Sequence, residues 1–469
     1  MATTSSPVDP AAPSASAAPA ASAAPPGERG GPTDPSHDVE LRRGILHTEV
    51  ARPLAVLLVA VFVAAIVAVP VGQAVAEKVK GEQSVLPDLF HQVPTRDSLR
   101  QFEEDLEKAC YAREWVRPRL QTRLTGYGGY GNTKAVIGRD HQWLFYQPGL
   151  VAVGGPGLLD EQILAARRKA GDGLDRGSTP LEPDPRPAIL DLQRFLAARG
   201  IALVIFPVPD KAALQPVELH GRAGAVRDQP PAQNPDFARL VAELRGAGVV
   251  VFDPTPSRLD PGAPPRFLAQ DTHWTPRWME EVAGDLARLL TERGLLPPPA
   301  PARARAWRIA PRAVTRVGDI VDMLGLPEGQ TLFAARTVTV DEVHAGGDGA
   351  GAGDLFAPSE SAELLLLGDS FTNVFSLGQM GWGEAAGLAP HLARALARDV
   401  DVIAQNDSGA HATRQLLWTA LGDRDASGAP VDRLAHKKVV VWEFAARELA
   451  VGNWKPLDWS AAIATRGAP

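Results

Sequence analysis

One stretch near the start of the chain constrains the fold more than any other. Residues 53–76 read PLAVLLVAVFVAAIVAVPVGQAVA and contain no charged side chain. A helix rises 1.5 Å per residue, so a helical segment of this length crosses the ~30 Å hydrocarbon layer of a bilayer. We therefore expect a transmembrane anchor, because a helix buried in a soluble core explains so long an uncharged run less well.

A cleaved signal peptide is the main alternative to a retained anchor. Ala74-Val75-Ala76 has the small-residue pattern of a cleavage site. However, a signal peptide has a short basic leader and an apolar stretch of about 7–15 residues. Here the apolar stretch is longer and begins only at residue 53. These features favour the anchor, and cleavage stays open as the alternative.

The charges beside the apolar segment predict its orientation. Arg42, Arg43 and Arg52 precede it, whereas the residues that follow carry both signs. Basic residues tend to remain on the cytoplasmic side. The short N-terminal arm is therefore expected in the cytoplasm and the main domain outside it, whether or not the segment is cleaved.

Composition divides the chain around this segment. Residues 1–45 are rich in Ala, Pro and Ser and contain few large apolar side chains, so they cannot bury enough surface to offset the entropy of ordering. We expect a disordered cytoplasmic arm at 1–45, the anchor at 53–76 and an extracytoplasmic domain at 90–460. Within that domain, apolar positions at helical spacing predict a helix over residues 95–123.

Charge and cysteine content exclude some classes of function. The net charge is -7, and the sequence has no long Lys/Arg run that could neutralise a row of phosphates, so we expect no nucleic-acid partner. Cys110 is the only cysteine, which leaves no internal disulfide and no cysteine-based zinc site. No group of His, Asp and Glu has metal-ligand spacing such as His-Glu-x-x-His, and we expect no metal.

The main domain alternates short apolar runs with amphipathic helices. The helices expected at 188–199 and 237–245 each end at a glycine before an apolar run. The runs that we expect to be strands lie at residues 135–138, 143–146, 201–206, 249–252, 364–367, 400–404 and 439–442. This alternation is typical of an α/β domain whose mostly parallel sheet is flanked by helices on both faces.

A serine follows one of these strands directly. Gly368-Asp369-Ser370-Phe371 comes after the apolar run at 364–367 and before a segment expected to start a helix. A serine at this place projects into the crevice at the carboxyl edge of an α/β sheet, and its backbone N–H faces a developing oxyanion. The alternative is that Asp369 or Ser370 only caps the helix.

An aspartate and a histidine lie two residues apart in Asp271-Thr272-His273. In an extended segment such side chains point to the same side, so the carboxylate can orient the imidazole and leave its other nitrogen for a serine. In isolation the pair is more often a capping or surface feature. Together with Ser370 it favours a catalytic triad. Thr275 and Pro276 then predict the start of a helix that runs to Arg288.

Five stretches in a fixed order carry a resemblance to a known family. They span about residues 135–450 and are 138–146, 207–211, 271–276, 368–371 and 440–447. The set resembles the SGNH-hydrolase-like polysaccharide O-acetyltransferases of the alginate AlgJ/AlgX type, which acetylate exopolysaccharides in the bacterial periplasm. With its N-terminal anchor the chain looks closer to AlgJ, so we expect a single-pass protein of the bacterial inner membrane.

The resemblance implies an SGNH-hydrolase-like fold and roles for individual residues. It implies a triad in which Asp271 and His273 precede Ser370 in the chain, and an asparagine among the oxyanion donors. The candidates for that donor are Asn406, which follows a strand, and its rival Asn373. Arg414 and Arg447 are candidates for binding an anionic sugar, although an arginine on a helix is usually solvated or salt-bridged.

The implied activity is O-acetyl transfer to hydroxyls of an exopolysaccharide or another envelope glycan, through an acyl-enzyme on Ser370. The acetyl donor is expected to be a multi-spanning membrane acyltransferase, and no soluble cofactor is implied. Two alternatives stay open. One is a carbohydrate acetyl esterase with the same triad, and the other is a catalytically idle glycan-binding assembly protein of an envelope secretion complex.

Overall fold

The computed structural model describes residues 51–81, 95–127, 134–170, 181–346, 353–406, 409–423 and 432–460. The chain divides into two compact units, Met1–Tyr111 and Ala112–Pro469, and each is described by itself. The expected disordered arm at residues 1–45 lies outside the described residues. The second unit begins later than the expected domain start at residue 90.

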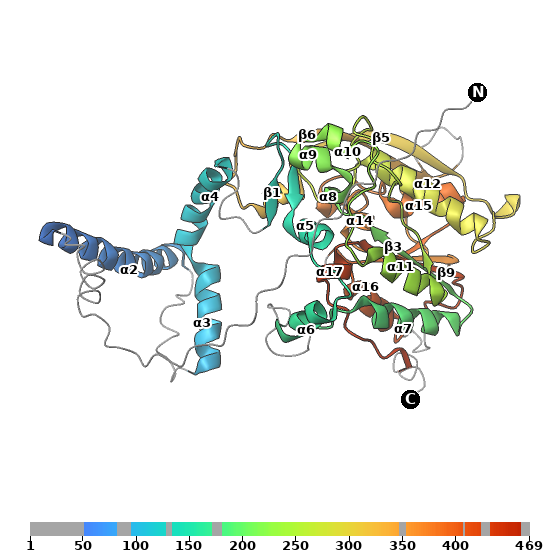
Figure 1. Ribbon diagram of the computed structural model, residues 1–469, viewed down its shortest axis with the longest axis horizontal. Helices are drawn as coiled ribbons and strands as arrows, with labels where there is room; N and C mark the ends of the chain where they lie inside the picture. Colours follow the sequence, from blue (N-terminus) through green and yellow to red (C-terminus); the bar gives the residue numbers. More distant parts are fainter. Residues whose placement is uncertain are drawn as a thin grey trace, which may run out of the picture. The chain divides into compact units, whose positions relative to one another are not determined.

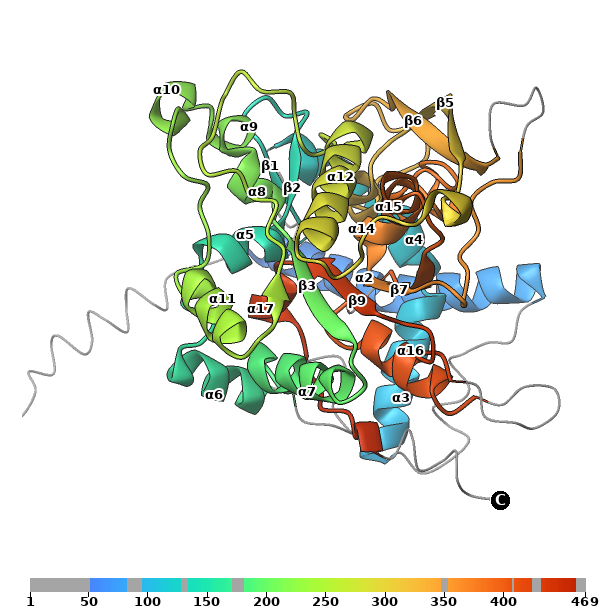
Figure 2. The ribbon, with the colours of Figure 1, turned by 90° about the vertical axis from the view of Figure 1, so that its right-hand side faces the viewer.

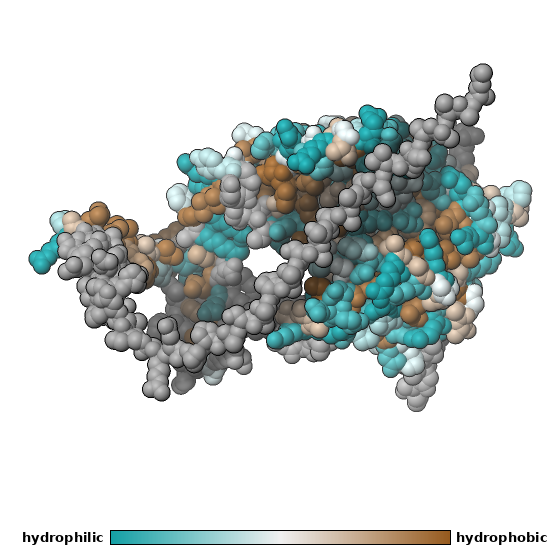
Figure 3. Space-filling model, viewed as in Figure 1, coloured by the Kyte–Doolittle hydropathy of each residue, from teal (hydrophilic) through white to brown (hydrophobic). Residues whose placement is uncertain are grey.

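The first unit contains the helices α2 (Arg52–Lys80) and α3 (Arg96–Ala109), drawn in blue in Figure 1. In the described part of the chain, α2 is the helix long and apolar enough to cross a membrane. Its apolar side chains are exposed, and Figure 3 shows this brown surface at one end of the view. The apolar stretch predicted at 53–76 thus forms one continuous helix, which extends to Lys80.

The last turns of α2 are tied to the end of α3. Gln73 Nε2 donates to Glu77 Oε1 and to the backbone carbonyl of Ala109, each at 2.7 Å. Gln73 Oε1 accepts from the Tyr111 backbone N–H at 2.9 Å. The uninterrupted apolar face therefore ends before Gln73, after roughly 20 residues, which is still the length that a spanning helix requires.

The helix predicted over residues 95–123 is divided in two. α3 ends at Ala109, and α4 (Tyr111–Gly126) begins after Cys110, whose backbone is extended with φ -70° and ψ 102°. Thr95 caps α3 by accepting a hydrogen bond from the Ser98 backbone N–H at 3.1 Å. The prediction of a single helix was wrong because one extended residue, Cys110, does not change the spacing of the apolar residues enough to be seen in the sequence.

The second unit holds the remaining elements. Its strands are β1 (Ala135–Ile137), β2 (Leu144–Tyr146), β3 (Ala202–Val208), β4 (Val250–Val251), β5 (Trp307–Arg316), β6 (Arg336–Ala345), β7 (Leu364–Gly368), β8 (Asp401–Ala404) and β9 (Val439–Ala445). After α4, its helices are α5 (Gln147–Gly154), α6 (Glu161–Ala170), α7 (Pro185–Ala197), α8 (Lys211–Leu214), α9 (Pro216–His220), α10 (Ala223–Val226), α11 (Phe237–Gly246), α12 (Pro276–Glu292), η2 (Pro301–Arg303), α13 (Asp319–Met323), α14 (Ser370–Asn373), η3 (Gly378–Met380), α15 (Leu388–Leu396), α16 (Ala412–Ala420) and α17 (Glu448–Val451).

A five-stranded sheet forms the centre of this unit, in the order β4-β3-β9-β7-β8. All its pairings are parallel, with β9 between β3 and β7. Each of these strands coincides with an apolar run identified in the sequence. The prediction of a mostly parallel sheet flanked by helices is confirmed.

Helices cover both faces of the sheet, as Figure 2 shows for α12 and α15 on one side and α7, α11 and α16 on the other. Successive strand residues point to opposite faces, so each strand contributes to both cores. The core beneath α12 and α15 includes Val204, Val441, Leu366, Val282 and Leu392. The core beneath α7, α11 and α16 includes Leu203, Val440, Leu365, Ile189 and Leu417.

Two antiparallel pairs lie outside the main sheet. β1 and β2 form the short pair that the sequence predicts, whereas the long pair β5–β6 was not predicted. Between β5 and β6 lies α13, whose Ile320 and Val321 pack in a small core with Ala135 and Leu144 of the β1–β2 pair. This inserted segment brings residue 319 to the site described below.

Candidate active site

Polar residues gather where the parallel strands end. Asp369 and Ser370 follow β7, Lys211 follows β3, Asn406 follows β8 and Arg447 follows β9. Because these strands are parallel, their carboxyl ends share one edge of the sheet, which is where α/β folds place their ligand crevice.

The turn that carries Ser370 is held by its neighbours. Asp369 is the N-cap of α14, and its Oδ1 accepts from the Phe371 backbone N–H at 2.8 Å. Asp369 Oδ2 accepts from the Ala445 backbone N–H at 2.8 Å, which ties the turn to β9. Capping is therefore done by Asp369, and the Ser370 hydroxyl has a different partner.

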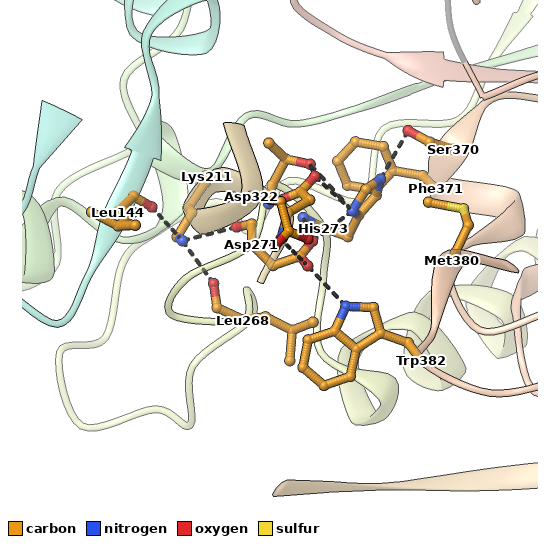
Figure 4. A network of polar contacts seen from close by, with 12 residues as sticks. Leu144, Lys211, Leu268, Asp271, His273, Asp322, Ser370, Phe371, Met380 and Trp382 are labelled. Atoms are coloured by element: carbon orange, nitrogen blue, oxygen red, sulfur yellow. Dashed lines mark hydrogen bonds and ion pairs between the residues drawn. The ribbon is translucent and has the colours of Figure 1, made fainter. Parts of the chain in front are cut away.

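The partner of Ser370 is His273. His273 Nε2 lies 2.8 Å from Ser370 Oγ, and His273 Nδ1 lies 2.6 Å from Asp271 Oδ1 (Figure 4). Asp271 Oδ1 also accepts from the backbone N–H of His273 at 3.0 Å. The three side chains proposed from the sequence thus form one continuous chain of hydrogen bonds, with the imidazole between the carboxylate and the hydroxyl.

The second oxygen of Asp271 is also occupied. Asp271 Oδ2 accepts from Trp382 Nε1 at 2.8 Å and from the Asp319 backbone N–H at 3.0 Å. The carboxylate is only 1% exposed. A buried carboxylate that accepts this many hydrogen bonds has one fixed orientation, and it holds the imidazole of His273 in place.

Burial and charge act in opposite directions on this pair. Burial raises the pKa of Asp271, but the charge of His273 and its hydrogen bond outweigh burial and hold the pKa below its ordinary value. Burial lowers the pKa of His273, yet the carboxylate of Asp271 leaves it above its ordinary value of 6.5. Burial and the charge of Asp271 raise the pKa of Asp319 to about 6. The anionic form of Asp271 is therefore favoured, and the protonated form of His273 is stabilised beside it.

Lys211 fixes the loop from which Asp271 emerges. Its ammonium is buried and lies 2.6–3.0 Å from four backbone carbonyl oxygens, those of Leu144, Leu268, Ala269 and Asp271. Figure 4 shows the contacts to Leu144 and Leu268. Burial lowers the pKa of Lys211 to about 7. Its role is to join β2 to the loop at 268–271, because its donors are directed at carbonyl groups of both segments.

The two asparagines suggested as rival oxyanion donors form a pair. Asn373 Nδ2 donates to Asn406 Oδ1 at 2.8 Å. With its carbonyl held in this way, Asn406 retains its amide donors. Among the described residues, no hydrogen bond is present at the backbone N–H of Ser370, which begins α14. Both donors suit a developing oxyanion.

Arg447 lies close to the serine. Its guanidinium is 5.2 Å from the ring centre of Tyr146 and 5.8 Å from that of Phe371, the residue after Ser370. Its Nη1 is 3.9 Å from Asp210 Oδ1. Burial lowers the pKa of Arg447, but the carboxylates of Asp210 and Asp369 outweigh it and raise the pKa. Arg447 is therefore a cation at the edge of the site.

Arg414 has an environment that differs from the expected one. It is fully buried in α16, where its guanidinium lies 5.4 Å from the Trp442 ring centre. Its side chain donates to the carbonyls of Ala410 at 3.0 Å and Lys455 at 2.9 Å. A side chain without solvent exposure cannot contact a polymer. The expectation that Arg414 binds an anionic sugar is therefore replaced by a packing role inside the domain.

Asp271, His273 and Asp319 also have the residue types of a metal site, with ligand atoms within 4.8 Å of one another. In this arrangement hydrogen bonds join these atoms to each other and to Thr272 and Trp382. The side-chain atoms that could bind a metal are thus used in hydrogen bonds that orient the His273 imidazole. The expectation that the protein needs no metal stays a prediction.

The model of the family described as "SGNH hydrolase-like domain, acetyltransferase AlgX" matches residues 136–446. The chain belongs to this family. Residues 136–446 of the AlgX-type chain contain the central sheet and every residue of the triad arrangement. The SGNH-like fold expected from the resemblance is therefore confirmed, with the parallel sheet as its core.

Individual relatives of this AlgX-family chain include a probable alginate O-acetylase AlgJ of Pseudomonas aeruginosa. It is 30% identical over 283 residues, which are 56% of this chain and 63% of that protein, so less than two thirds of the relative is matched. Among solved structures, the O-acetyltransferase domain of Pseudomonas putida AlgJ is 22% identical, with a TM-score of 0.47, and the match covers 71% of this chain and 99% of that one. Pseudomonas aeruginosa AlgX is 18% identical with a TM-score of 0.43, covering 73% of this chain and 71% of that one.

Sequence reasoning did not find several residues of this candidate site. Asp319 and Trp382 contact Asp271 from segments far along the chain, and no local motif marks either of them. Lys211 lies in one of the five stretches that resemble the family, residues 207–211, but the sequence around it did not suggest a role for it. The available signal was that Lys211 is a charged residue placed shortly after a buried strand and at the start of an apolar helix.

Proposed function

We propose that this protein is an O-acetyltransferase that moves an acetyl group through a Ser370 acyl-enzyme to hydroxyls of an exopolysaccharide. One observation carries the proposal: a buried imidazole lies 2.8 Å from a serine hydroxyl and 2.6 Å from a carboxylate, in a member of the AlgX acetyltransferase family. This is the geometry that a serine nucleophile with a general base requires.

The first step transfers the acetyl group to the enzyme. His273 Nε2 accepts the Ser370 hydroxyl proton while Oγ attacks the carbonyl carbon of the acetyl donor. The bond from this carbon to the leaving group then breaks, and the imidazolium returns the proton to the leaving group. Asp271 stays ionised throughout and stabilises the transient imidazolium.

The second step reverses these roles with a different acceptor. A glycan hydroxyl gives its proton to His273 Nε2 as its oxygen attacks the carbonyl carbon of acetyl-Ser370. The ester bond to Oγ breaks, and Oγ takes the proton back from the imidazolium. If water attacks instead, acetate is released and the protein is an esterase, so the outcome depends on which acceptor reaches the acyl-enzyme.

Two donors are proposed for the oxyanion of each tetrahedral intermediate. They are the Ser370 backbone N–H and the side-chain amide of Asn406, which Asn373 orients. Removing one such donor in other serine enzymes costs about 10²–10³ in kcat.

A cavity of about 690 Å³ is the proposed place for the acceptor chain. Its walls include Tyr146, His411, Glu448 and Lys455. His411 follows β8 and Glu448 follows β9, so the cavity belongs to the same edge of the sheet as Ser370. The Arg447 guanidinium is 5.2 Å from the ring centre of Tyr146, which lines the cavity, and 5.8 Å from that of Phe371, the residue after the proposed nucleophile, and its charge suits an anionic sugar. The alginate named in the relatives is the proposed polymer class.

The anchor gives this activity a location. We propose that α2 holds the protein in the inner membrane with residues 90–460 in the periplasm. A tether beside a multi-spanning membrane acyltransferase would raise the effective concentration of the acetylated donor, without any soluble cofactor.

Transfer and hydrolysis are separated by following an acetyl ester donor with and without a uronate oligosaccharide. A transferase consumes the donor faster when the sugar is present, and acetylated sugar accumulates in the mass spectrum. An unchanged rate with acetate as the product would make the protein an esterase. Failure to consume donor in both cases would support the idle glycan-binding alternative.

A further inference from the structure

Glu443 occupies a position that the proposed chemistry does not explain. It lies in β9, in the centre of the sheet, and has no solvent exposure. Its Oε2 accepts from the Asp369 backbone N–H at 3.1 Å and from Thr372 Oγ1 at 2.6 Å. These two donors flank Ser370 in the chain, so one carboxyl group bonds the nucleophile turn on both sides of the nucleophile.

The turn has little freedom apart from this contact. A Cβ atom added to Gly368 would lie 2.2 Å from Thr372 Oγ1, which shows how closely the threonine side chain covers the end of β7. Asp369 is bound in turn to the Ala445 backbone N–H, two residues after Glu443 in the same strand. β9 therefore holds the turn through Glu443 on one side and Ala445 on the other.

The carboxyl group has no cation to balance a negative charge. Among the described residues, no ion pair involves Glu443, and its Oε1 accepts no hydrogen bond from an N–H or O–H donor. Its side chain lies close enough to Asp369 for a hydrogen bond between the two carboxyl groups. Burial and the nearby charge of Asp369 raise the pKa of Glu443 well above 4.5. The charges that act on Asp369 include those of His273 and Arg447, which are of opposite sign when His273 is protonated, and that of Glu448, which is of like sign. The balancing charges thus lie beside Asp369, which favours a proton on Glu443.

We propose that Glu443 is a positioning residue that, as a neutral carboxylic acid, holds the turn from Asp369 to Thr372 in the conformation that presents Ser370 to His273. The inference rests on the proposed function, because it gives Glu443 a part in serine reactivity. A neutral acid can accept both hydrogen bonds through one oxygen. If Glu443 were ionised, its carboxylate would repel the carboxylate of Asp369 and distort the turn.

The test compares two substitutions in the full chain held in lipid nanodiscs. Glu443→Gln keeps a neutral group of the same shape with a carbonyl acceptor, and Glu443→Ala removes the acceptor. The control is Asp401→Asn, because Asp401 is equally buried but pairs with Lys437 and Arg433 at the opposite end of the sheet. The measurement is the rate at which a sulfonyl fluoride labels Ser370, followed by mass spectrometry.

We expect the labelling rate of Glu443→Gln to lie within about threefold of the wild-type rate. The rate of Glu443→Ala should be lower by on the order of 100-fold, because small misplacements of reacting groups cause losses of this size. Asp401→Asn should lose stability and keep its labelling rate. Wild-type labelling that Glu443→Ala leaves unchanged would overturn the positioning role. Equal losses in the Gln and Ala variants would overturn the neutral form. A wild-type Ser370 that never reacts would instead contradict the proposed function itself.

Melting temperature against pH gives a readout that does not depend on activity. With a raised pKa, folded Glu443 keeps a proton that the unfolded chain releases above pH 4.5, so the wild type loses stability as pH rises from there toward the folded pKa. Glu443→Gln has no such proton. Its melting temperature relative to the wild type should therefore be higher at pH 7 than at pH 4. A difference that is the same at both pH values would overturn the neutral acid.

Discussion

At the scale of single residues, the proposed mechanism makes the rate depend on the protonation state of His273. As a base it must be neutral, and the charge of Asp271 holds its pKa above 6.5 despite burial. We therefore expect the rate of Ser370 acylation to fall as pH drops through a value above 6.5. The measurement is the acylation rate over a range of about pH 5 to 9.

Asp271→Asn supplies the matched comparison, because it removes the carboxylate that raises the pKa of His273. The acid limb of the remaining activity should move to lower pH in this variant. An acid limb in the wild type below pH 6.5, or one that Asp271→Asn leaves in place, would contradict the assignment of His273 as the base.

The sequence reaches some of these residues and not others. Asp271, His273 and Ser370 were found because two short motifs place complementary groups at strand and loop ends. Asp319 and Trp382 complete the environment of Asp271 only through the tertiary fold, since they come from separate inserted segments. Arg414 was misjudged because a sequence does not say which face of α16 is buried against Trp442.

At the scale of elements, the turn between β7 and α14 leaves no room for added volume at Gly368. Gly368→Ala places a Cβ atom 2.2 Å from Thr372 Oγ1 and so displaces the side chain that Glu443 holds. We expect this variant to lose most acyl transfer, on the order of 100-fold, while remaining folded. Activity and melting temperature of the same preparation measure both effects.

Gly284→Ala in α12 is the control for the glycine substitution. No heavy atom lies within 4 Å of a Cβ added there, and alanine is favoured over glycine inside a helix by about 1 kcal/mol. It should leave activity unchanged and raise the melting temperature slightly. Equal activity in the two glycine variants would mean that the turn tolerates the added atom.

The helices and strands could be predicted where their burial produces a recognisable pattern of apolar residues in the sequence. Strands buried on both faces appear as continuous apolar runs, and β3, β7 and β9 were found in this way. The edge strands β4 and β8 are less buried and were found from the apolar runs at residues 249–252 and 400–404. In β5 the partly buried and exposed positions follow no regular period, and Pro311 interrupts the strand signal, so the pair β5–β6 was missed. The break at Cys110 left no signal in the periodicity of α3 and α4.

At the scale of the whole molecule, the proposal that α2 is a membrane anchor predicts on which side of the membrane the second unit lies. Because Arg42, Arg43 and Arg52 precede the apolar segment, a reporter enzyme fused after residue 90 should be active only outside the cytoplasm. Reversing the arginines to glutamate should reduce that activity. A reporter that is active in the cytoplasm would remove the periplasmic glycan as substrate.

The central claim is that Ser370, His273 and Asp271 act as one unit in acyl transfer. The most direct measurement is oligosaccharide-dependent acyl transfer, together with melting temperature, in Ser370→Ala, His273→Ala and the Ser370→Ala/His273→Ala double variant. We expect each single variant to lose several orders of magnitude in rate while staying folded, and the double variant to be little worse than either. Acyl transfer that persists at the wild-type rate in Ser370→Ala would contradict the account.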